Sequence, residues 1–233
     1  GTKQETVVYC GDRWANFAGN GLGYNQWFPL SFNGTEPYFN SLSSWNINAK
    51  TGEWNLAFDN NFVKNGSFEA DRRRIPSHVK PVQEYLLGWE TTVIEGNKVS
   101  LDSNSSPVLN YFNTESDRKI VTGEKSLHIS DRINFKRKVS QTITSSPYVK
   151  LEDGFYTLKA MVKNSSGFTK LEMYTGSNGK IVKHSFQQEN ASWTAIEIKH
   201  IQVKNGEIEI GFLAEGSANA FCYVDDVTLV KTK

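Results

Sequence analysis

The chain has 233 residues, with 26 basic and 25 acidic side chains and a formal net charge of +1. This balance gives no sign of a basic surface for nucleic acid. The sequence also contains no run of about 18 apolar residues, which a membrane-spanning helix would need. Aromatic residues make up 12% of the chain and lie among many Ser, Thr, Asn and Gly residues, a composition typical of short strands joined by polar turns.

The segment at 1–57 is predicted to be small and β-rich. Strand-like stretches with several aromatic residues lie at 6–9, 24–32, 44–47 and 52–54. The glycine-rich stretch at 18–23 is interpreted as a loop between strands. A phosphate-binding loop is disfavoured because no helix follows it and no Gly-Lys-Ser/Thr pattern is present.

Three motifs of this segment resemble the closing part of the five-bladed propeller of family 43 glycoside hydrolases. They are Gly11-Asp12-Arg13-Trp14, Trp27-Phe28-Pro29-Leu30 and Thr51-Gly52-Glu53-Trp54. The resemblance covers roughly residues 5–57. It implies that the catalytic carboxylates come from blades upstream of this chain. An upstream catalytic propeller of the same protein is therefore an expected partner, and we expect no catalytic residue here.

Residues 58–233 predict a β-sandwich. Strand-like stretches recur every 10–15 residues or so, and none shows a sustained helical period. In the stretch at 193–203, Ile196 and Ile198 have one parity and Ile201 and Val203 the other, which predicts a β-bulge near Lys199–His200. The predicted fold is all-β: a jelly-roll β-sandwich at 58–233 after a propeller-blade-like segment at 1–57.

The last strand-like stretch, Phe221–Val230, carries two adjacent carboxylates, Asp225 and Asp226. Like charges side by side need solvent, a hydrogen-bond donor or a cation. We expect this strand to meet the segment that ends in Glu69, so that Glu69 and Asp225 share a calcium ion. The alternative is that Glu69 pairs with an arginine at 72 or 73 and that Asp225 caps a turn.

A second resemblance spans roughly residues 58–233. The ordered motifs are Asn65-Gly66-Ser67-Phe68-Glu69, Gly88-Trp89, Gly123–Ile129, Gln141-Thr142-Ile143, Asp153–Tyr156, Trp193 and Tyr223–Val227. They resemble carbohydrate-binding modules of the family 4, 9 and 22 type. The resemblance implies a jelly roll with one structural calcium. The implied ligands are the side chains of Glu69 and Asp225 and the backbone carbonyls of Ser67, Thr122 and Lys125.

The same resemblance implies a sugar site built on aromatic rings. Sugars stack their C–H groups on such rings, while polar side chains bind the hydroxyls. The matching aromatic positions are Phe135 and Tyr174. The polar neighbours that we select are Glu172, Gln187, His128 and Lys159. Packing inside the protein remains the alternative role for each ring, and Trp89 and Trp193 are expected in the core.

These observations predict a non-catalytic module that binds a polysaccharide or oligosaccharide outside the cytoplasm, in the periplasm, at the cell surface or in the medium. One alternative is a sandwich that only supports the catalytic propeller. Another is a hydrolase in which Glu172, Glu197 or Glu209 serves as an acid. The two cysteines, Cys10 and Cys222, lie at opposite ends and are expected as buried thiols rather than a disulfide.

Overall fold

The computed structural model describes residues 1–13, 24–40, 42–68, 86–98, 109–110, 121 and 125–232. These residues form strands and loops without a helix, which confirms the predicted all-β class. None of them therefore provides a helix with the length and apolar character needed to cross a membrane. Several sequence features discussed above lie outside the described residues, among them Trp14, the loop at 18–23, Glu69, the arginines at 72 and 73, and Thr122.

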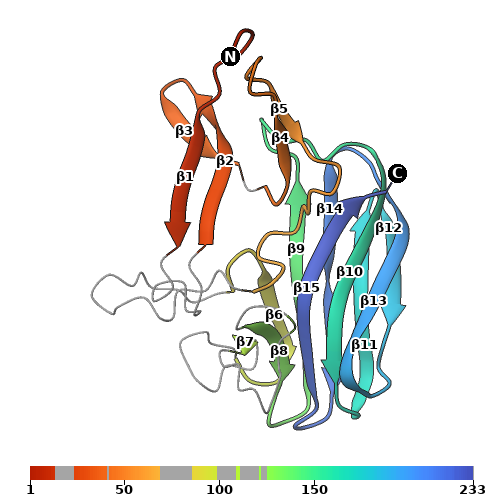
Figure 1. The fold of residues 1–233 in the computed structure, drawn as a ribbon. Coiled ribbons are helices and arrows are strands. Elements are labelled where there is room, and N and C mark those ends of the chain that lie inside the picture. The colour runs from red at the N-terminus through yellow and green to blue at the C-terminus, as the bar shows by residue number, and fades with distance from the viewer. Residues whose placement is uncertain are drawn as a thin grey trace.

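The segment at 1–57 contributes two small antiparallel sheets. A three-stranded sheet has the order β1 (Val8–Arg13), β2 (Tyr24–Asn33) and β3 (Glu36–Phe39). A hairpin joins β4 (Trp45–Ile47) to β5 (Trp54–Leu56). Both lie at one end of the molecule, away from the larger sheets (Figure 1). The ring of Tyr38 packs against Tyr148 with centroids 5.1 Å apart, which brings β3 into contact with the larger part of the protein.

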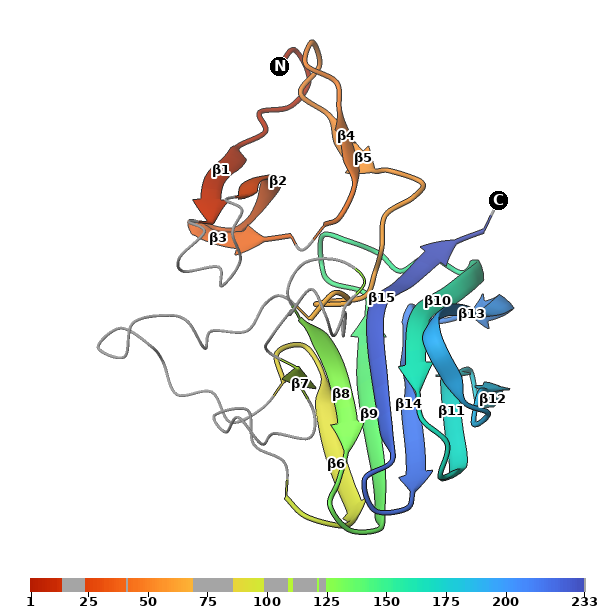
Figure 2. The same ribbon diagram turned by 60° about the horizontal axis from the view of Figure 1, so that its bottom comes forward.

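The remaining strands form two five-stranded antiparallel sheets that stack as two layers (Figure 2). The β15 sheet has the order β13-β10-β15-β8-β7, and the β14 sheet has the order β12-β11-β14-β9-β6. The strands are β6 (Glu90–Glu95), β7 (Leu109–Asn110), β8 (Ser126–Ser130), β9 (Phe135–Thr144), β10 (Gly154–Asn164), β11 (Phe168–Ser177), β12 (Lys180–Ser185), β13 (Asn190–Val203), β14 (Glu207–Gly216) and β15 (Phe221–Lys231).

The core lies between these sheets and follows the predicted alternation. In β14, Ile208, Ile210, Phe212 and Ala214 occupy alternate positions and are all buried, as the period of two in a strand requires for the inward face. Trp89 is 4% exposed and contacts the rings of Phe68 and Phe212, so its predicted core position is confirmed. Trp193 is only partly buried, however, because it lies in the edge strand β13. The two thiols also differ, since Cys222 is buried and Cys10 is exposed, and both are free.

Two bulges adjust which side chains enter the core. In the pairing of β10 with β13, Tyr156 pairs with Ile201 and Leu158 pairs with Ile198, so Lys199 and His200 together lie opposite the single residue Thr157, and His200 has φ +55°. The predicted bulge at this position is confirmed. A second bulge lies in β15, where Met161 pairs with Asp225 but Lys159 pairs with Thr228.

The bulge in β15 explains how two aspartates fit into a buried strand. Asp226 has φ +48°, a left-handed conformation that Asp tolerates better than most residues. Both Val224 and Val227 can therefore point into the core, although three positions separate them. Asp225, which follows Val224, is fully buried. It pairs with Met161 and points to the outward side of the sheet.

The end of the chain lies beside the start of the sandwich, as the sequence predicts. Phe62 N donates to Leu229 O at 3.0 Å, and Val227 N donates to Gly66 O at 2.9 Å. The side-chain amide of Asn61 donates to Val227 O at 3.1 Å and accepts from Leu229 N at 2.9 Å. Residues 61–66 thus cover the edge of β15 beyond the end of its pairing with β8, which satisfies polar groups that an open edge would leave exposed.

Candidate functional site

The predicted calcium ligands come from three segments, around Ser67, around Thr122 and at Asp225. The second and third of these meet at Asp225. Its Oδ2 accepts a hydrogen bond from Val121 N at 2.7 Å, and its Oδ1 accepts one from Asp226 N at 2.8 Å. Val121 directly precedes Thr122, and the bond between Val227 and Gly66 brings the segment containing Ser67 alongside β15. Burial of a carboxylate requires such donors or a cation. The two N–H donors are also compatible with the alternative in which Asp225 stabilises a turn.

The described residues supply only part of the predicted ligand set. Ser67 is half-buried, Lys125 is 3% exposed, and Asp225 is inaccessible to solvent. Within the described residues, no group of three or more His, Cys, Asp or Glu side chains comes together. A hard oxygen site made of one described carboxylate, several backbone carbonyls and Glu69 is consistent with the ligands that calcium takes. The calcium site stays a prediction.

The six predicted sugar-binding residues do not form one site. Glu172 and Tyr174 lie on the outer face of the β14 sheet, whereas His128 and Lys159 lie on the outer face of the β15 sheet. The ring of His128 stacks on Tyr223 at 4.6 Å, and Lys159 lies 3.9 Å from Glu197. Gln187 is exposed between β12 and β13.

The prediction for Phe135 is wrong in this structure. Its side chain is 1% exposed and packs in the core, with the ring of Phe168 edge-on at 6.0 Å and the Arg137 guanidinium 5.1 Å from its centroid. The strand β9 begins at Phe135, so this residue shares the inward face with Arg137 and Val139. An enclosed ring has no face to offer a sugar.

Tyr174 occupies the middle of the outer face of the β14 sheet. Strand register places it between Lys183 of β12 and Gly211 of β14, with Ser140 of β9 as the next residue across. A Cβ at Gly211 would lie 2.9 Å from both Cε1 and Oη of the tyrosine. The ring therefore lies across Gly211, against the sheet, in a space that a larger residue would fill. The side chain is only half-buried, so part of the ring remains exposed.

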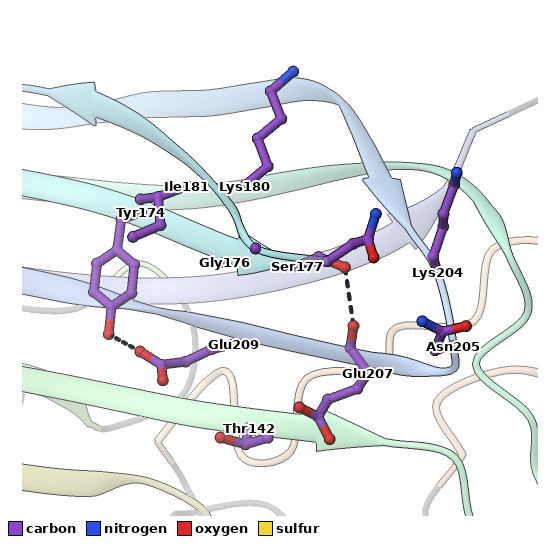
Figure 3. Close-up of a pocket in the computed structure, with 12 residues that line it drawn as sticks. Thr142, Tyr174, Gly176, Ser177, Lys180, Ile181, Lys204, Asn205, Glu207 and Glu209 are labelled. Atoms are coloured by element: carbon purple, nitrogen blue, oxygen red, sulfur yellow. Dashed lines mark hydrogen bonds between the residues drawn. The ribbon is translucent and has the colours of Figure 1, made fainter.

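Hydrogen bonds hold this ring in place. The hydroxyl of Tyr174 donates to Glu209 Oε1 at 2.5 Å, and Lys138 Nζ lies 2.8 Å from the same oxygen (Figure 3 shows the tyrosine bond). Lys138 Nζ is also 5.7 Å from the ring centroid, within the range of a cation–π contact. Tyr174 is thus tied to both β14 and β9, which restricts the motion of its ring.

Burial and hydrogen bonds determine the protonation states of Tyr174, Lys138 and Glu209. Burial, together with the hydrogen bond to Glu209, raises the pKa of Tyr174 to about 12, so the phenol stays neutral and donates at neutral pH. The hydrogen bond to Glu209 raises the pKa of Lys138. Burial pushes the pKa of Glu209 up, but the bonds from Lys138 and Tyr174 outweigh it and leave this pKa lowered. Lys138 and Glu209 are therefore a charged pair.

A second ion pair flanks the ring. Lys183 Nζ lies 2.9 Å from Glu172 Oε2, and strand register puts Lys183 opposite Tyr174 and Glu172 two residues before it. The Lys183 side chain is 48% exposed and that of Glu172 is 16% exposed. An ammonium and a carboxylate beside a partly exposed ring offer a donor and an acceptor to neighbouring hydroxyl groups.

The three glutamates considered as acids are all engaged in ion pairs. Glu172 pairs with Lys183 and Glu209 with Lys138, while Glu197 Oε1 lies 2.7 Å from Lys199 Nζ. The bond from Lys199 lowers the pKa of Glu197. A general acid needs a raised pKa, so neither Glu197 nor Glu209 is poised to donate a proton.

The similarity of this chain to known proteins lies in its fold. No family model matches this chain, and no curated protein matches its sequence. A family 61 carbohydrate-binding module in complex with β-1,4-galactotriose is similar, with a TM-score of 0.53 and 19% identity, over 74% of this chain and 99% of that module. Modules of families 4, 11, 16 and 22 are also similar, with lower TM-scores.

Two further structures bear a looser likeness. A putative sugar binding protein from Bacteroides thetaiotaomicron has a TM-score of 0.43 and 15% identity, over 74% of this chain and 100% of its own. An exo-β-1,3-galactanase from Phanerochaete chrysosporium has a TM-score of 0.34 and 17% identity, over 96% of this chain and 41% of the enzyme. The predicted resemblance to carbohydrate-binding modules is confirmed at the level of the fold: this chain contains the β-sandwich of such modules.

Proposed function

We propose that this chain is a non-catalytic carbohydrate-binding module that holds its ligand on the outer face of the β14 sheet, around Tyr174. The observation that carries the proposal is the placement of this ring across Gly211, anchored by Glu209 and flanked by the ion pair of Glu172 and Lys183. A partly exposed ring provides an apolar surface for sugar C–H groups, and the flanking charges provide partners for hydroxyls.

The likeness to a module bound to β-1,4-galactotriose supports this proposal and selects the first ligands to test, β-1,4-linked galacto-oligosaccharides. A role as the accessory part of a glycoside hydrolase rests on the resemblance of residues 5–57 to a family 43 propeller blade. In that role the module would attach an upstream catalytic propeller to a plant or host polysaccharide. Such a substrate lies outside the cytoplasm, so we place the protein in the medium, the periplasm or at the cell surface.

We also propose the structural calcium. Its ligands would be the carboxylates of Glu69 and Asp225 and the backbone carbonyls of Ser67, Thr122 and Lys125. The support for it is the convergence on Asp225, which is fully buried and bonded to Val121, while the segment of Ser67 lies alongside the same strand. A cation at this point would tie three distant segments together and stabilise the folded state.

A second candidate function is purely structural, with the sandwich supporting another module. It is favoured by the composition of the outer face of the β14 sheet, which besides Tyr174 carries a series of ion pairs, including Lys136–Glu215 at 3.1 Å. Such a face is also suited to solvent or to a polar protein surface. The two functions differ in one measurable respect, because only the first requires Tyr174 for binding a free oligosaccharide.

Replacing Tyr174 by Ala is expected to weaken oligosaccharide binding about tenfold or more, since the variant loses the stacking surface. Tyr174→Phe keeps the ring and loses the hydroxyl with its hydrogen bonds, including the one to Glu209, so its affinity should stay within roughly threefold of the parent protein. Isothermal titration calorimetry with β-1,4-galactotriose at millimolar concentration measures both effects.

The matched control is Phe155→Ala. Phe155 is an aromatic residue, 51% exposed, on the outer face of the other sheet, and its removal should leave the affinity unchanged. Binding by Tyr174→Ala that equals the parent protein would reject the site. An absence of binding to galactan, arabinan and xylan oligosaccharides by the parent protein would reject the function and leave the structural role.

A further inference from the structure

A cavity of about 580 Å³ continues from Tyr174 along the outer face of the β14 sheet (Figure 3). Its volume falls within the roughly 300–1,000 Å³ that is usual for small-molecule sites. The cavity runs from the tyrosine ring past Gly176 to two turns, at 177–180 and 204–207, with Thr142 and Glu209 among its lining residues. It therefore shares Tyr174 and Glu209 with the site proposed above but extends beyond it.

The two turns that bound the cavity have fixed shapes. Each is a two-residue Asn-Gly hairpin turn with positive φ at both positions, +51° and +73° for Asn178 and Gly179 and +61° and +64° for Asn205 and Gly206. These values are typical of the type I′ turn that matches strand twist. The Ser177 hydroxyl donates to Glu207 O at 3.0 Å, which ties the two turns to each other. The end wall of the cavity is thus preformed.

The lining of the cavity combines one apolar patch with balanced charges. Ile181 is 65% exposed and lies opposite Gly176 in the strand register, so its side chain adds an apolar surface beside the ring. The lining includes two lysines, Lys180 and Lys204, and two glutamates, Glu207 and Glu209. Hydroxyl, amide, ammonium and carboxylate groups all form hydrogen bonds with sugar hydroxyls, and their balance gives no net attraction for an anion.

We infer that this cavity is a second sugar subsite, which holds the residues of a neutral oligosaccharide that extend beyond the unit stacked on Tyr174. This inference rests on the proposed function and specifies its ligand: an uncharged chain longer than a disaccharide, with one end against the turns at 177–180 and 204–207. Affinity should therefore rise with chain length, and it should be nearly independent of ionic strength, because charge attraction contributes little.

Gly176 provides a direct test, because its missing side chain forms part of the cavity. A Cβ at this position would meet only Ile181 Cγ1, at 4.0 Å, and the glycine does not need a positive φ. Gly176→Val therefore puts a strand-favouring residue into the cavity, with Ile181 as the only neighbour of its Cβ. We expect this variant to lose the gain in affinity between galactobiose and galactotetraose, roughly tenfold, while galactobiose binds as in the parent protein.

The matched control is Thr92→Val, which introduces the same residue at an exposed position of β6, the opposite edge strand of the same sheet. It should keep the full dependence on chain length, and thermal unfolding should show both variants folded.

If Gly176→Val keeps that dependence while Tyr174→Ala loses binding, the cavity is not a subsite and the proposed function stands. If affinity for the neutral series falls several-fold between 50 and 500 mM NaCl, the neutral-ligand assignment is wrong. Failure of the parent protein to bind any member of the series overturns both proposals.

Discussion

Replacing Arg137 by Leu is expected to lower the free energy of unfolding by about 3–5 kcal/mol, because it leaves a buried carboxylate without its cation. Arg137 is fully buried and forms an ion pair with Asp131, which is 7% exposed. Its guanidinium also donates to Ser130 O at 2.6 Å and to Asn97 O at 3.0 Å. One side chain thus fixes the turn between β8 and β9 and the loop that follows β6.

Urea denaturation measures this effect, with Lys136→Leu as the matched control. Lys136 is the neighbour of Arg137 in β9, but its pair with Glu215 lies at the surface, where the two side chains are 33% and 39% exposed. Such pairs contribute roughly 0–1 kcal/mol. Equal losses in the two variants would show that the buried pair has no special role in stability.

The same pair predicts how stability depends on pH. Burial alone would raise the pKa of Asp131, but hydrogen bonds from Asn97, Arg137 and Arg132 lower it from 3.8 to about 2. A carboxylate with a depressed pKa in the folded state contributes stability that is complete above the unfolded pKa and is lost as pH falls toward the folded one. The loss should amount to about 2 kcal/mol between pH 5 and pH 2. Asp131→Asn should remove this component, and an unchanged acid sensitivity in that variant would contradict the assignment.

Calcium is expected to raise the melting temperature of the metal-stripped protein by about 5–10 °C at a concentration 100 times the dissociation constant. This range follows from a linkage energy of about 2.7 kcal/mol and a shift of about 2–4 °C per kcal/mol for a chain of this size. Asp225→Asn should abolish this rise in melting temperature, because the variant lacks one of the two carboxylates proposed to bind calcium. Differential scanning calorimetry with calcium, magnesium and a chelator measures it.

Asp226→Asn is the control for this experiment, since it changes the neighbouring carboxylate and preserves the left-handed conformation that Asn also tolerates. It should keep the calcium response. If calcium does not change the melting temperature of the parent protein, the proposed structural calcium is wrong. Hydrogen bonds of Asp225, including those from Val121 and Asp226, would then hold the three segments without a cation.

The alternation of apolar and polar residues with a period of two predicts the sandwich from the sequence. The inward residues of β14 and the bulge at Lys199–His200 follow from parity alone, because one face of each strand must be buried. The return of β15 to residues 61–66 was also predictable, since paired carboxylates in an apolar strand need partners. The second bulge, at Asp226, was not predicted, because period-two alternation contains no signal for a left-handed aspartate.

The candidate site was harder to predict for two physical reasons. The prediction for Phe135 fails because a charged residue, Arg137, occupies an inward position of β9 and hides the alternation that would place Phe135 in the core. His128 and Lys159 were grouped with Tyr174 because alternation gives the face of a strand but not its sheet. Strand order depends on pairings between distant segments, and it places β8 and β10 in a different sheet from β11.

The sequence contains one further signal for the site. Gly211 interrupts the outward positions of β14, where Glu207, Glu209, Leu213 and Glu215 alternate with buried residues. Glycine within a strand often marks the close approach of another group. Here that group is the ring of Tyr174. Such a glycine predicts that something lies against the sheet, although register is needed to say which residue it is.

The most direct measurement is a titration of the protein with β-1,4-galactotriose followed by backbone amide NMR. The proposed site predicts that the largest shifts occur at Tyr174, Gly176 and Ile181, on one outer face and along one cavity. Shifts centred on His128 and Lys159, on the other face of the sandwich, or an absence of shifts at millimolar sugar, would contradict it.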